Sequence, residues 1–560
     1  MKKIVLTSKI FSLILSGFLV SCSGSNHGEL VGVQNRPDFY PSDPYGMVYI
    51  PQGSFNAGNA DVDVPATLTA PTKTVSVSSF YMAETEITNN EYRQFVHWVR
   101  DSILRYRLAE GLVEDYEYIS YADLQNPTYF EEYVGIEYPD SMQSHLDWNK
   151  KLSWDSRKFP SIEYTEVLET MYLAPEERYL GGRMLDTRQL NYLYFWIDKQ
   201  KAARKSNRVN MDFTDNDADG MTFNYRDYIK DGESISDRSS FFESETINIY
   251  PDTLVWLSDF TYSFNEQMHD NYFWHPAYDN YPVVGVNWKQ AMAFCNWRSR
   301  FRNEYLKDNN DFQESEFRLP TESEWEYAAR GGFELTTYPW GGPYTTNSAG
   351  CFLANFKPSR GNLTADGGFH PVKATSYEPN GYGLYCMAGN VAEWTSTAWD
   401  EASYYYVGDF NPDFKYNADE NDPETMKRKV IRGGSWKDIA AYLQVSSREY
   451  EYQDTNKSYI GFRTVQSFLG RDARDFIKDP VAQQSGLGYE ECNSVMNHDP
   501  AMYENGFCKS PEQLADQVNR YCSLMSQSSM RFFAGVVVLL GMTAPGQAED
   551  TIDYVTEVFP

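Results

Sequence analysis

The sequence predicts an α+β protein with much irregular structure, because strand signals and helix-start signals alternate along the chain. Met47–Phe55 is an apolar run that enters a glycine turn, and Val75–Tyr81 alternates in the manner of a half-buried strand. Thr88 and Glu91 are spaced as a capping box, in which a hydroxyl and a carboxylate satisfy free amides at a helix start. Aromatic residues make up 16% of the 560 residues, enough for packed rings to stabilise long irregular segments.

The N-terminus has the features of an export signal. Two lysines precede a short apolar run, Ile10–Val20, that ends just before Cys22. This pattern is typical of a lipoprotein signal peptide, and the run is too short for a membrane span. We therefore expect residues 1–21 to be removed, Cys22 to carry lipid and residues 22–46 to form a linker. The alternative is an ordinary secretory signal in which Cys22 is incidental.

Composition excludes several classes of protein. A net charge of −30, without a stripe of basic residues, disfavours binding to nucleic acid. The mean hydropathy of −0.58 excludes an integral membrane protein. Six cysteines remain besides Cys22, in a compartment that permits disulfides, and the sequence does not fix their connectivity.

Two further helices are predicted in the second half of the chain. Asn287 precedes an apolar run of helical spacing that includes Cys295, so we expect a buried thiol there and not a nucleophile. Thr321 and Glu324 form a second capping box, and the paired glycines that begin at Gly331 end that helix.

The second of these helices is rich in carboxylates. Glu322, Glu324 and Glu326 are candidates for acid–base catalysis. The simpler interpretation is structural ion pairing, and the candidate partners are Arg318, Arg330 and Arg463.

The segment Arg432–Trp436 contains paired glycines, which allow one backbone to press against another. Together with Gly461–Val465 and the elements above, it resembles the catalytic region of the sulfatase-modifying-factor family, the formylglycine-generating enzymes. The resemblance implies a C-type-lectin-like α+β fold over residues 47–468. It also implies that two cysteines should follow the glycines, where their thiolates bind copper. Asp438 and Leu443 occupy those positions, so we expect no formylglycine-generating activity.

The resemblance also implies calcium sites built from oxygen ligands, which calcium prefers. The positions that match the first site are Asn355, Phe356, Asp366 and Gly368. The positions that match the second are Gly389, Val391 and Glu393. Cys386 replaces an Asn or Asp of the second site, and a thiol is a poor calcium ligand, so this site is the weaker of the two. We therefore expect calcium, if bound, to be structural, and we expect no required cofactor.

Residues from about 101 to 278 form a large insertion that the basic fold does not need. Trp256, Phe273 and Trp274, near its end, are predicted to contact neighbouring copies or a partner, because aromatic residues are favoured in interfaces. The alternative is that they pack the insertion onto its own core. Within the insertion, Asp215, Asp217 and Asp219 resemble the first half of a calcium loop, but Arg226 replaces the final Glu, and a solvated acidic loop is the alternative.

The lipoprotein signal, the missing copper cysteines and the aromatic end of the insertion together resemble the PorK/GldK lipoproteins of the type IX secretion and gliding apparatus of Bacteroidetes. The resemblance implies an outer-membrane lipoprotein on the periplasmic side, a homo-oligomeric ring and a PorN/GldN-like periplasmic partner. It implies a structural subunit and not an enzyme. Ser23, after the lipidated position, also favours sorting to the outer membrane.

Two other assignments remain open. One is a gliding lipoprotein similar to GldJ. The other is an oxidase with rearranged cysteines, for which Cys351 and Cys386 are the candidates, although they are far apart in sequence. Of the histidines, His370 lies among the core motifs, and we expect a satisfied surface imidazole.

Residues 469–560 form a C-terminal extension of unknown role, outside the resemblance. Three of its cysteines, the first of which is Cys492, could supply one disulfide and a free thiol. The apolar run Phe532–Met542 resembles a misplaced signal peptide, and a buried strand or a fusion artefact are the alternatives.

Overall fold

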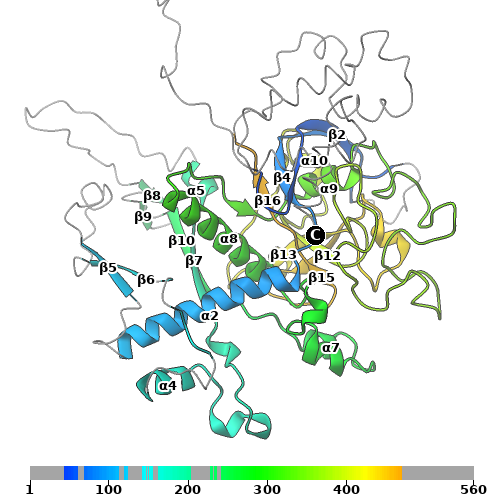
Figure 1. The fold of residues 1–560 in the computed structure, drawn as a ribbon. Helices are drawn as coiled ribbons and strands as arrows, with labels where there is room; N and C mark the ends of the chain where they lie inside the picture. Colours follow the sequence, from blue (N-terminus) through cyan, green and yellow to red (C-terminus); the bar gives the residue numbers. More distant parts are fainter. Residues whose placement is uncertain are drawn as a thin grey trace, which may run out of the picture. The chain divides into compact units, whose positions relative to one another are not determined.

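A computed structural model describes most of the predicted folded domain. The described residues are 43–60, 69–111, 162–203 and 241–469, with shorter stretches at 119–123, 142–146, 148, 151–154, 228–230 and 233–235. They belong to one compact unit, Pro41–Leu469 (Figure 1). Cys22, the acidic loop at Asp215–Asp219 and the extension beyond Leu469 lie outside the described residues.

Two four-stranded sheets form the centre of the unit. The first has the order β1 (Met47–Ile50), β4 (Phe80–Ala83), β16 (Val465–Ser467) and β11 (Phe317–Arg318). The second has the order β14 (Glu449–Tyr452), β13 (Arg428–Arg432), β12 (Ala392–Ala398) and β15 (Ile460–Gly461). Since β16 pairs with β4, the end of the domain is tied to its beginning.

Four two-stranded sheets complete the strands of the described residues. They are β2 (Gly53–Ala57) with β3 (Lys73–Val77), β5 (Ile119–Asp123) with β6 (Met142–Leu146), β7 (Asn191–Ile197) with β10 (Phe242–Asn248), and β8 (Tyr228–Lys230) with β9 (Glu233–Ile235). The predicted single strand Val75–Tyr81 is therefore wrong. Ser78 and Ser79 belong to neither strand, and β3 and β4 join different sheets.

The helices pack around these sheets. They are α2 (Asn89–Gly111), α4 (Ile162–Glu169), α5 (Lys199–Ala203), α6 (Val255–Ser258), α7 (Glu266–Asn271), α8 (Trp288–Asp308), α9 (Glu322–Arg330) and α10 (Ser403–Tyr406). The capping box predicted at Thr88 is confirmed, since its backbone N–H donates to Glu91 and the Glu91 N–H donates back. The helix α2 continues past residue 101, where the sequence predicts the start of the insertion.

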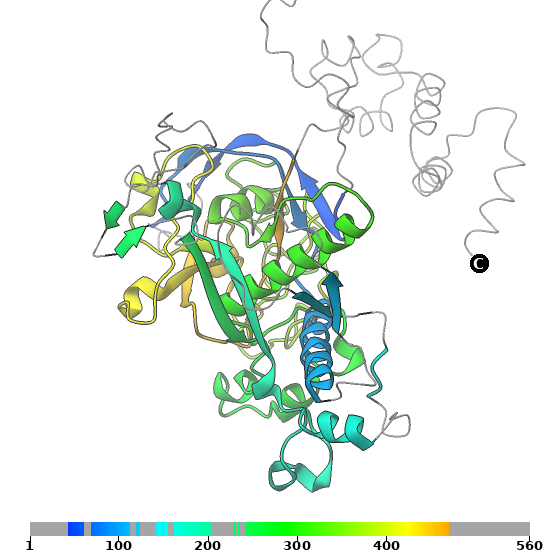
Figure 2. The same ribbon diagram turned by 90° about the vertical axis from the view of Figure 1, so that its left-hand side faces the viewer.

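The main hydrophobic core joins the insertion to the rest of the domain. Tyr92 on α2 stacks on Phe294 of α8 at 5.6 Å between ring centroids, and Phe95 meets Tyr192 of β7 edge-on at 5.2 Å. The ribbon formed by β7 and β10 therefore packs against both long helices (Figures 1 and 2). Cys295, on the same core, is 1% exposed, as predicted for a buried thiol.

The aromatic residues at the end of the insertion mostly face inward. Trp256 and Phe273 are 1% and 3% exposed and belong to the hydrophobic core of the chain. The prediction that these two side chains contact other molecules is wrong, because their own domain covers them. Trp274 is 37% exposed and stacks on His97.

Candidate functional site

The helix α9 places its carboxylates by means of sequence signals at its two ends. Thr321 and Glu324 form the predicted capping box, with each side chain accepting from the backbone N–H of the other residue. Gly331 ends the helix in a left-handed conformation at φ 59°, which glycine adopts without a steric penalty. The carboxylates are thus held on a short helix that contacts the β2–β3 pair and the strands β12 and β13 (Figure 1).

Each carboxylate of α9 is paired with arginine. Glu324 accepts two hydrogen bonds of 2.6 Å from Arg318. Glu322 and Glu326 lie deeper and share Arg432, at 3.3 Å from Glu322. The other partners are Arg448 for Glu322 and Arg330 for Glu326. The predicted structural pairing is confirmed, except that Arg463 pairs with Glu393 and not with this helix.

The electrostatics of this cluster oppose acid–base catalysis. Burial would raise the pKa of Glu326, but Arg330 and Arg432 outweigh burial, so the pKa of its carboxyl lies below the usual value. Arg318 lowers the pKa of Glu324 in the same way, against the effect of burial. Carboxylates held ionised by buried arginines are poor proton donors at neutral pH. The cluster therefore connects β13 and the neighbouring loops to α9.

The paired glycines form the close contact that the sequence predicts. A Cβ on Gly434 would lie 2.8 Å from the carbonyl oxygen of Tyr442, and one on Gly433 would lie 3.2 Å from the indole of Trp325. Both residues have positive φ, at 94° and 66° for Gly433 and Gly434. The turn thus brings the 3₁₀ helix Ala440–Leu443 against the segment where the resemblance places copper.

The two residues at the copper positions stabilise the fold. Asp438 accepts hydrogen bonds from the backbone N–H and the hydroxyl of Ser435, and its other oxygen lies 2.7 Å from Lys437. Leu443 is fully buried in an apolar cluster with Tyr338 and Phe356. Copper in such sites needs soft thiolate ligands. A carboxylate in a turn and a buried aliphatic side chain do not fit copper.

The first candidate calcium site is assembled in space. The Asp366 carboxylate accepts from the backbone N–H groups of Phe356 at 2.7 Å and of Gly368 at 3.3 Å. A Cβ on Gly368 would lie 2.7 Å from Oδ1 of Asn355, so only glycine fits beside this amide oxygen. Burial raises the pKa of Asp366. A partly buried carboxylate beside an amide oxygen fits a hard cation such as calcium.

The second candidate calcium site is less suited to a cation. Glu393 accepts from two nitrogens of Arg463 and from the indole N–H of Trp325 at 2.7 Å. The backbone N–H of Gly389 donates to Gly433, and that of Val391 donates to the buried carboxyl of Glu86. The charge of Glu393 is thus already balanced by an arginine.

The free cysteines of the described residues do not form a thiolate pair. Cys351 is exposed, whereas Cys386 is buried and its thiol donates to the carbonyl of Ala374 at 3.3 Å. Burial raises the pKa of Cys386 well above that of an ordinary thiol. Because the thiolate is the reactive form, Cys386 is an inert structural residue.

The environment of His370 differs from the predicted surface imidazole. His370 is half-buried, with ring contacts to Trp256 and Trp436 at 5.6 and 5.3 Å between centroids. Burial lowers the pKa of this imidazole. Its backbone carbonyl accepts from the Asn355 side chain, which ties it to the first candidate calcium site. Within the described residues, no cluster of three or more His, Cys, Asp or Glu could hold a metal ion.

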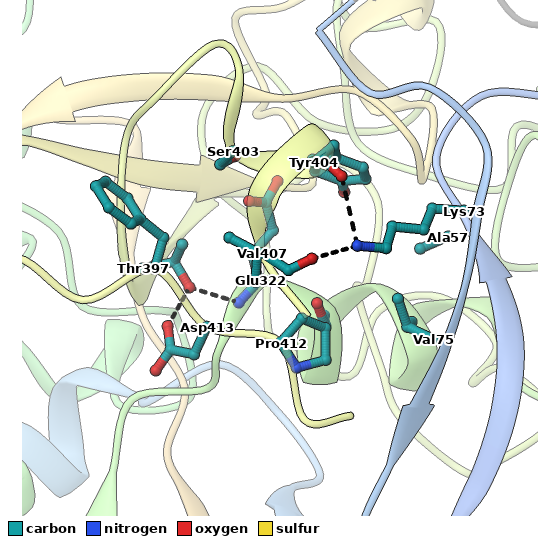
Figure 3. A pocket seen from close by; sticks show the side chains of 12 residues that line it. Ala57, Lys73, Val75, Glu322, Thr397, Ser403, Tyr404, Val407, Pro412 and Asp413 are labelled. Carbon is teal, nitrogen blue, oxygen red and sulfur yellow. Dashed lines mark hydrogen bonds between the residues drawn. The ribbon is translucent and has the colours of Figure 1, made fainter. Parts of the chain in front are cut away.

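A pocket lies beside α9, and the polar side chains Lys73 and Thr397 line it (Figure 3). Lys73 points into it and donates to the carbonyl of Val407, and it pairs with Asp409 at 3.0 Å. Thr397 donates to Asp413 at 2.9 Å and accepts from the backbone of Glu322 at 3.0 Å. Lys73 and Thr397 are thus held by hydrogen bonds and an ion pair within the fold.

Comparisons with known proteins identify the family. The model of the FGE-sulfatase domain, described as sulfatase-modifying factor enzyme 1-like, matches residues 36–164 and 178–468. The chain belongs to the FGE-sulfatase family. The predicted α+β fold of this family is therefore confirmed, and so is the resemblance of Arg432–Trp436 to it.

Two relatives show the range of the family. A formylglycine-generating enzyme of Mus musculus is 34% identical over 198 residues, which are 34% of this chain and 45% of that protein. The inactive Cα-formylglycine-generating enzyme 2 of the same species is 33% identical over 201 residues, covering 35% of this chain and 51% of that protein. The chain spans about half the length of these curated relatives. Family membership alone does not decide between activity and inactivity.

Among solved structures, PvdO from Pseudomonas aeruginosa is similar to this chain at 15% identity and a TM-score of 0.35. The match covers 75% of this chain and 94% of the PvdO chain.

Among the helices that the structure describes, none is both long enough and apolar enough to cross a bilayer.

We predict that calcium stabilises the fold through Asp366 and Asn355. A ligand that binds only the folded state, at a hundredfold excess over its Kd, raises the free energy of unfolding by about 2.7 kcal/mol. A chelator should therefore lower the Tm of the natural chain in a thermal melt but leave that of Asp366→Ala unchanged. The exposed Asp311→Ala variant is the control and should respond like the natural chain. An equal response of Asp366→Ala and the natural chain would remove this site.

Proposed function

We propose that this chain is a non-catalytic member of the FGE-sulfatase family that acts by assembly with other proteins. The observation that carries the proposal is the use of both copper positions for structure: Asp438 holds the turn at Ser435, and Leu443 fills an apolar cluster. The paired arginines around Glu322 and Glu326 leave no free acid or base in the neighbouring cluster. Inactive relatives in the same family support the proposal.

We further propose that the protein is an outer-membrane lipoprotein facing the periplasm and a ring subunit of a type IX secretion and gliding apparatus. The support is the lipoprotein signal that ends at Cys22, the family fold without copper cysteines, and the resemblance to the PorK/GldK lipoproteins. In this role it binds further copies of itself and a PorN/GldN-like periplasmic protein. Calcium, where bound, has a structural role.

The anchor and the assembly are tested together by replacing Cys22 with Ala. The natural chain should fractionate with outer membranes and migrate on a native gel in a complex much larger than its own 64.6 kDa. Cys22→Ala lacks the lipidated residue, so it should move almost entirely to the soluble fraction. Buried Cys295→Ala is the control for loss of a thiol and should remain in the membrane. Unchanged fractionation of Cys22→Ala would refute the anchor, and a natural chain that migrates only as a monomer would refute the assembly.

A further inference from the structure

The outer face of the ribbon formed by β7 and β10 carries an unusual set of exposed apolar side chains. Along β7, the residues alternate between buried tyrosines and exposed Leu193, Phe195 and Ile197, which are 46%, 53% and 45% exposed. Phe242 lies opposite Ile197 on β10 and is 49% exposed. Alternating residues of a strand share one face, so these four side chains form a single apolar stripe.

This face also carries no charged side chain. Its eight residues are Asn191, Leu193, Phe195, Ile197, Phe242, Ser244, Thr246 and Asn248. Charged residues make up 23% of the chain, so an uncharged face of this length is a departure from the rest of the sequence. Exposed apolar patches rimmed by polar residues mark sites of interaction.

Among the residues that the structure describes, the outer edge of β10 has backbone groups without a hydrogen-bond partner. The N–H of Asp198 donates to Phe241 and that of Ile249 donates to Leu190, which fixes the hydrogen-bonded pairs of the ribbon. Because such pairs alternate with non-bonded pairs, the N–H and C=O groups of Phe242, Ser244 and Thr246 point away from β7. None of the described residues bonds to these groups.

The two outer edges of the ribbon are not equivalent. On the edge of β7, the side chain of Asn296 on α8 donates to the carbonyl of Phe195 at 3.2 Å. On the edge of β10, Gln290 covers only the last residue, through the carbonyl of Asn248 at 3.0 Å. The edge of β10 from Phe242 to Thr246 is therefore the one that can accept another strand.

The acidic residues on the other face of β10 favour a bound strand with basic side chains. Glu243 is 41% exposed in its side chain and lies 3.6 Å from Lys201. Glu245 is 28% exposed and pairs with Lys289 at 2.7 Å. Lys289 also pairs with Asp454 at 3.2 Å, so these ion pairs contain three carboxylates and two lysines. A strand added beside β10 would place every second side chain next to this excess of negative charge, where basic residues are favourable. The remaining side chains would lie beside Phe242 and Thr246, on the apolar face.

We propose that the edge of β10 binds an extended segment of a partner protein, in which apolar and basic residues alternate. Main-chain hydrogen bonds to β10 supply affinity, and the apolar stripe and the glutamates supply specificity. A second copy of this chain is a poorer occupant of this face. Pairing β10 with the β10 of a second copy would place Glu243 and Glu245 of one chain beside those of the other, and like charges on neighbouring strands are destabilising. The inference deepens the proposed assembly role and rests on it.

A labelled synthetic peptide of alternating valine and lysine is the probe, with fluorescence anisotropy as the measurement on the full chain. The probe should bind saturably, and a peptide of alternating valine and glutamate should not. Ser244→Pro removes an outward N–H without disturbing the pairing with β7, and it should weaken binding about tenfold or more. Phe242→Ser, on β10 itself, should also weaken it, whereas Phe264→Ser, an exposed phenylalanine outside the ribbon, should not. Circular dichroism checks that each variant is folded.

Three results of the peptide experiment would contradict the proposed site. Absence of binding, equal binding of the acidic peptide, or full binding by Ser244→Pro each removes the edge of β10 as the site. If the chain instead dimerises and Ser244→Pro abolishes the dimer, a second copy occupies the edge and the proposed partner is wrong. Formation of aldehyde by the chain would overturn the non-catalytic function, and it would leave the peptide result unaffected.

Discussion

Replacing Arg463 with Met should lower the free energy of unfolding by about 3–5 kcal/mol. Arg463 is fully buried and gives two hydrogen bonds, of 2.7 and 2.6 Å, to the carboxylate of Glu393. It also donates to the backbone carbonyls of Ala83 and Tyr385. The substitution removes the ion-pair partner of Glu393, which is 1% exposed, and, among the described residues, leaves only the indole N–H of Trp325 as a side-chain donor to it. Urea denaturation at neutral pH measures the loss.

Two variants separate the charge effect from simple loss of volume. Arg463→Met combined with Glu393→Gln removes both charges, so it should recover part of the stability that Arg463→Met loses. Arg188→Met removes an arginine that is 64% exposed and paired with Asp186 and Glu177, and it should change the free energy of unfolding far less, because water screens an exposed ion pair. Equal losses at Arg463 and Arg188 would contradict the structural role of the buried pair.

Replacing Lys429 with Met should stabilise the protein at neutral pH. Lys429 is 0% exposed, donates to the carbonyl of Tyr416 at 2.7 Å and lies 3.9 Å above the ring of Trp288. Burial lowers its pKa from 10.5 to about 7, although Asp413 and Asp454 act in the opposite direction. The unfolded chain therefore binds this proton more strongly than the folded chain does, and the natural protein gains stability as the pH rises from 7 towards 10.5.

The difference between Lys429→Met and the natural chain should therefore shrink as the pH rises. Between pH 7 and pH 9 the natural chain should gain about 2 kcal/mol that the variant does not gain. Urea denaturation of both proteins across this range measures it, and other titrating groups cancel in the comparison. Lys307→Met, an exposed lysine at the end of α8, is the control and should show no such dependence on pH. A difference that stays constant with pH would contradict this account. It would show that Lys429 stays charged in the folded protein across this pH range.

Local signals in the sequence predicted the features that carry the family fold. The capping boxes at Thr88 and Thr321, the end of α9 at Gly331 and the burial of Cys295 each depend on residues a few positions apart. Those interactions are set by the local backbone and require no knowledge of the tertiary structure. The close approach at Gly434 was predictable for the same reason, because only glycine permits it.

Features that depend on distant partners were not predictable from the sequence. The carboxylates of α9 were expected to form ion pairs, but the choice of Arg432 and Arg448 for Glu322 depends on how β13 and the following loop reach the helix. The division of Val75–Tyr81 into two strands depends on two different sheets. Trp256 looked like an interface residue and is buried, because aromatic composition does not tell a core from an interface.

The central claim is that the family fold here carries no oxidase chemistry, and aldehyde formation tests it most directly. The purified chain is incubated with copper, oxygen and a cysteine peptide that an active formylglycine-generating enzyme converts, with that enzyme as the positive control. Mass spectrometry then detects the loss of the thiol and the gain of the aldehyde. We expect no aldehyde above the level without protein, because Asp438 and Leu443 occupy the copper positions. Aldehyde that depends on Cys351 or Cys386 would contradict the proposed non-catalytic function.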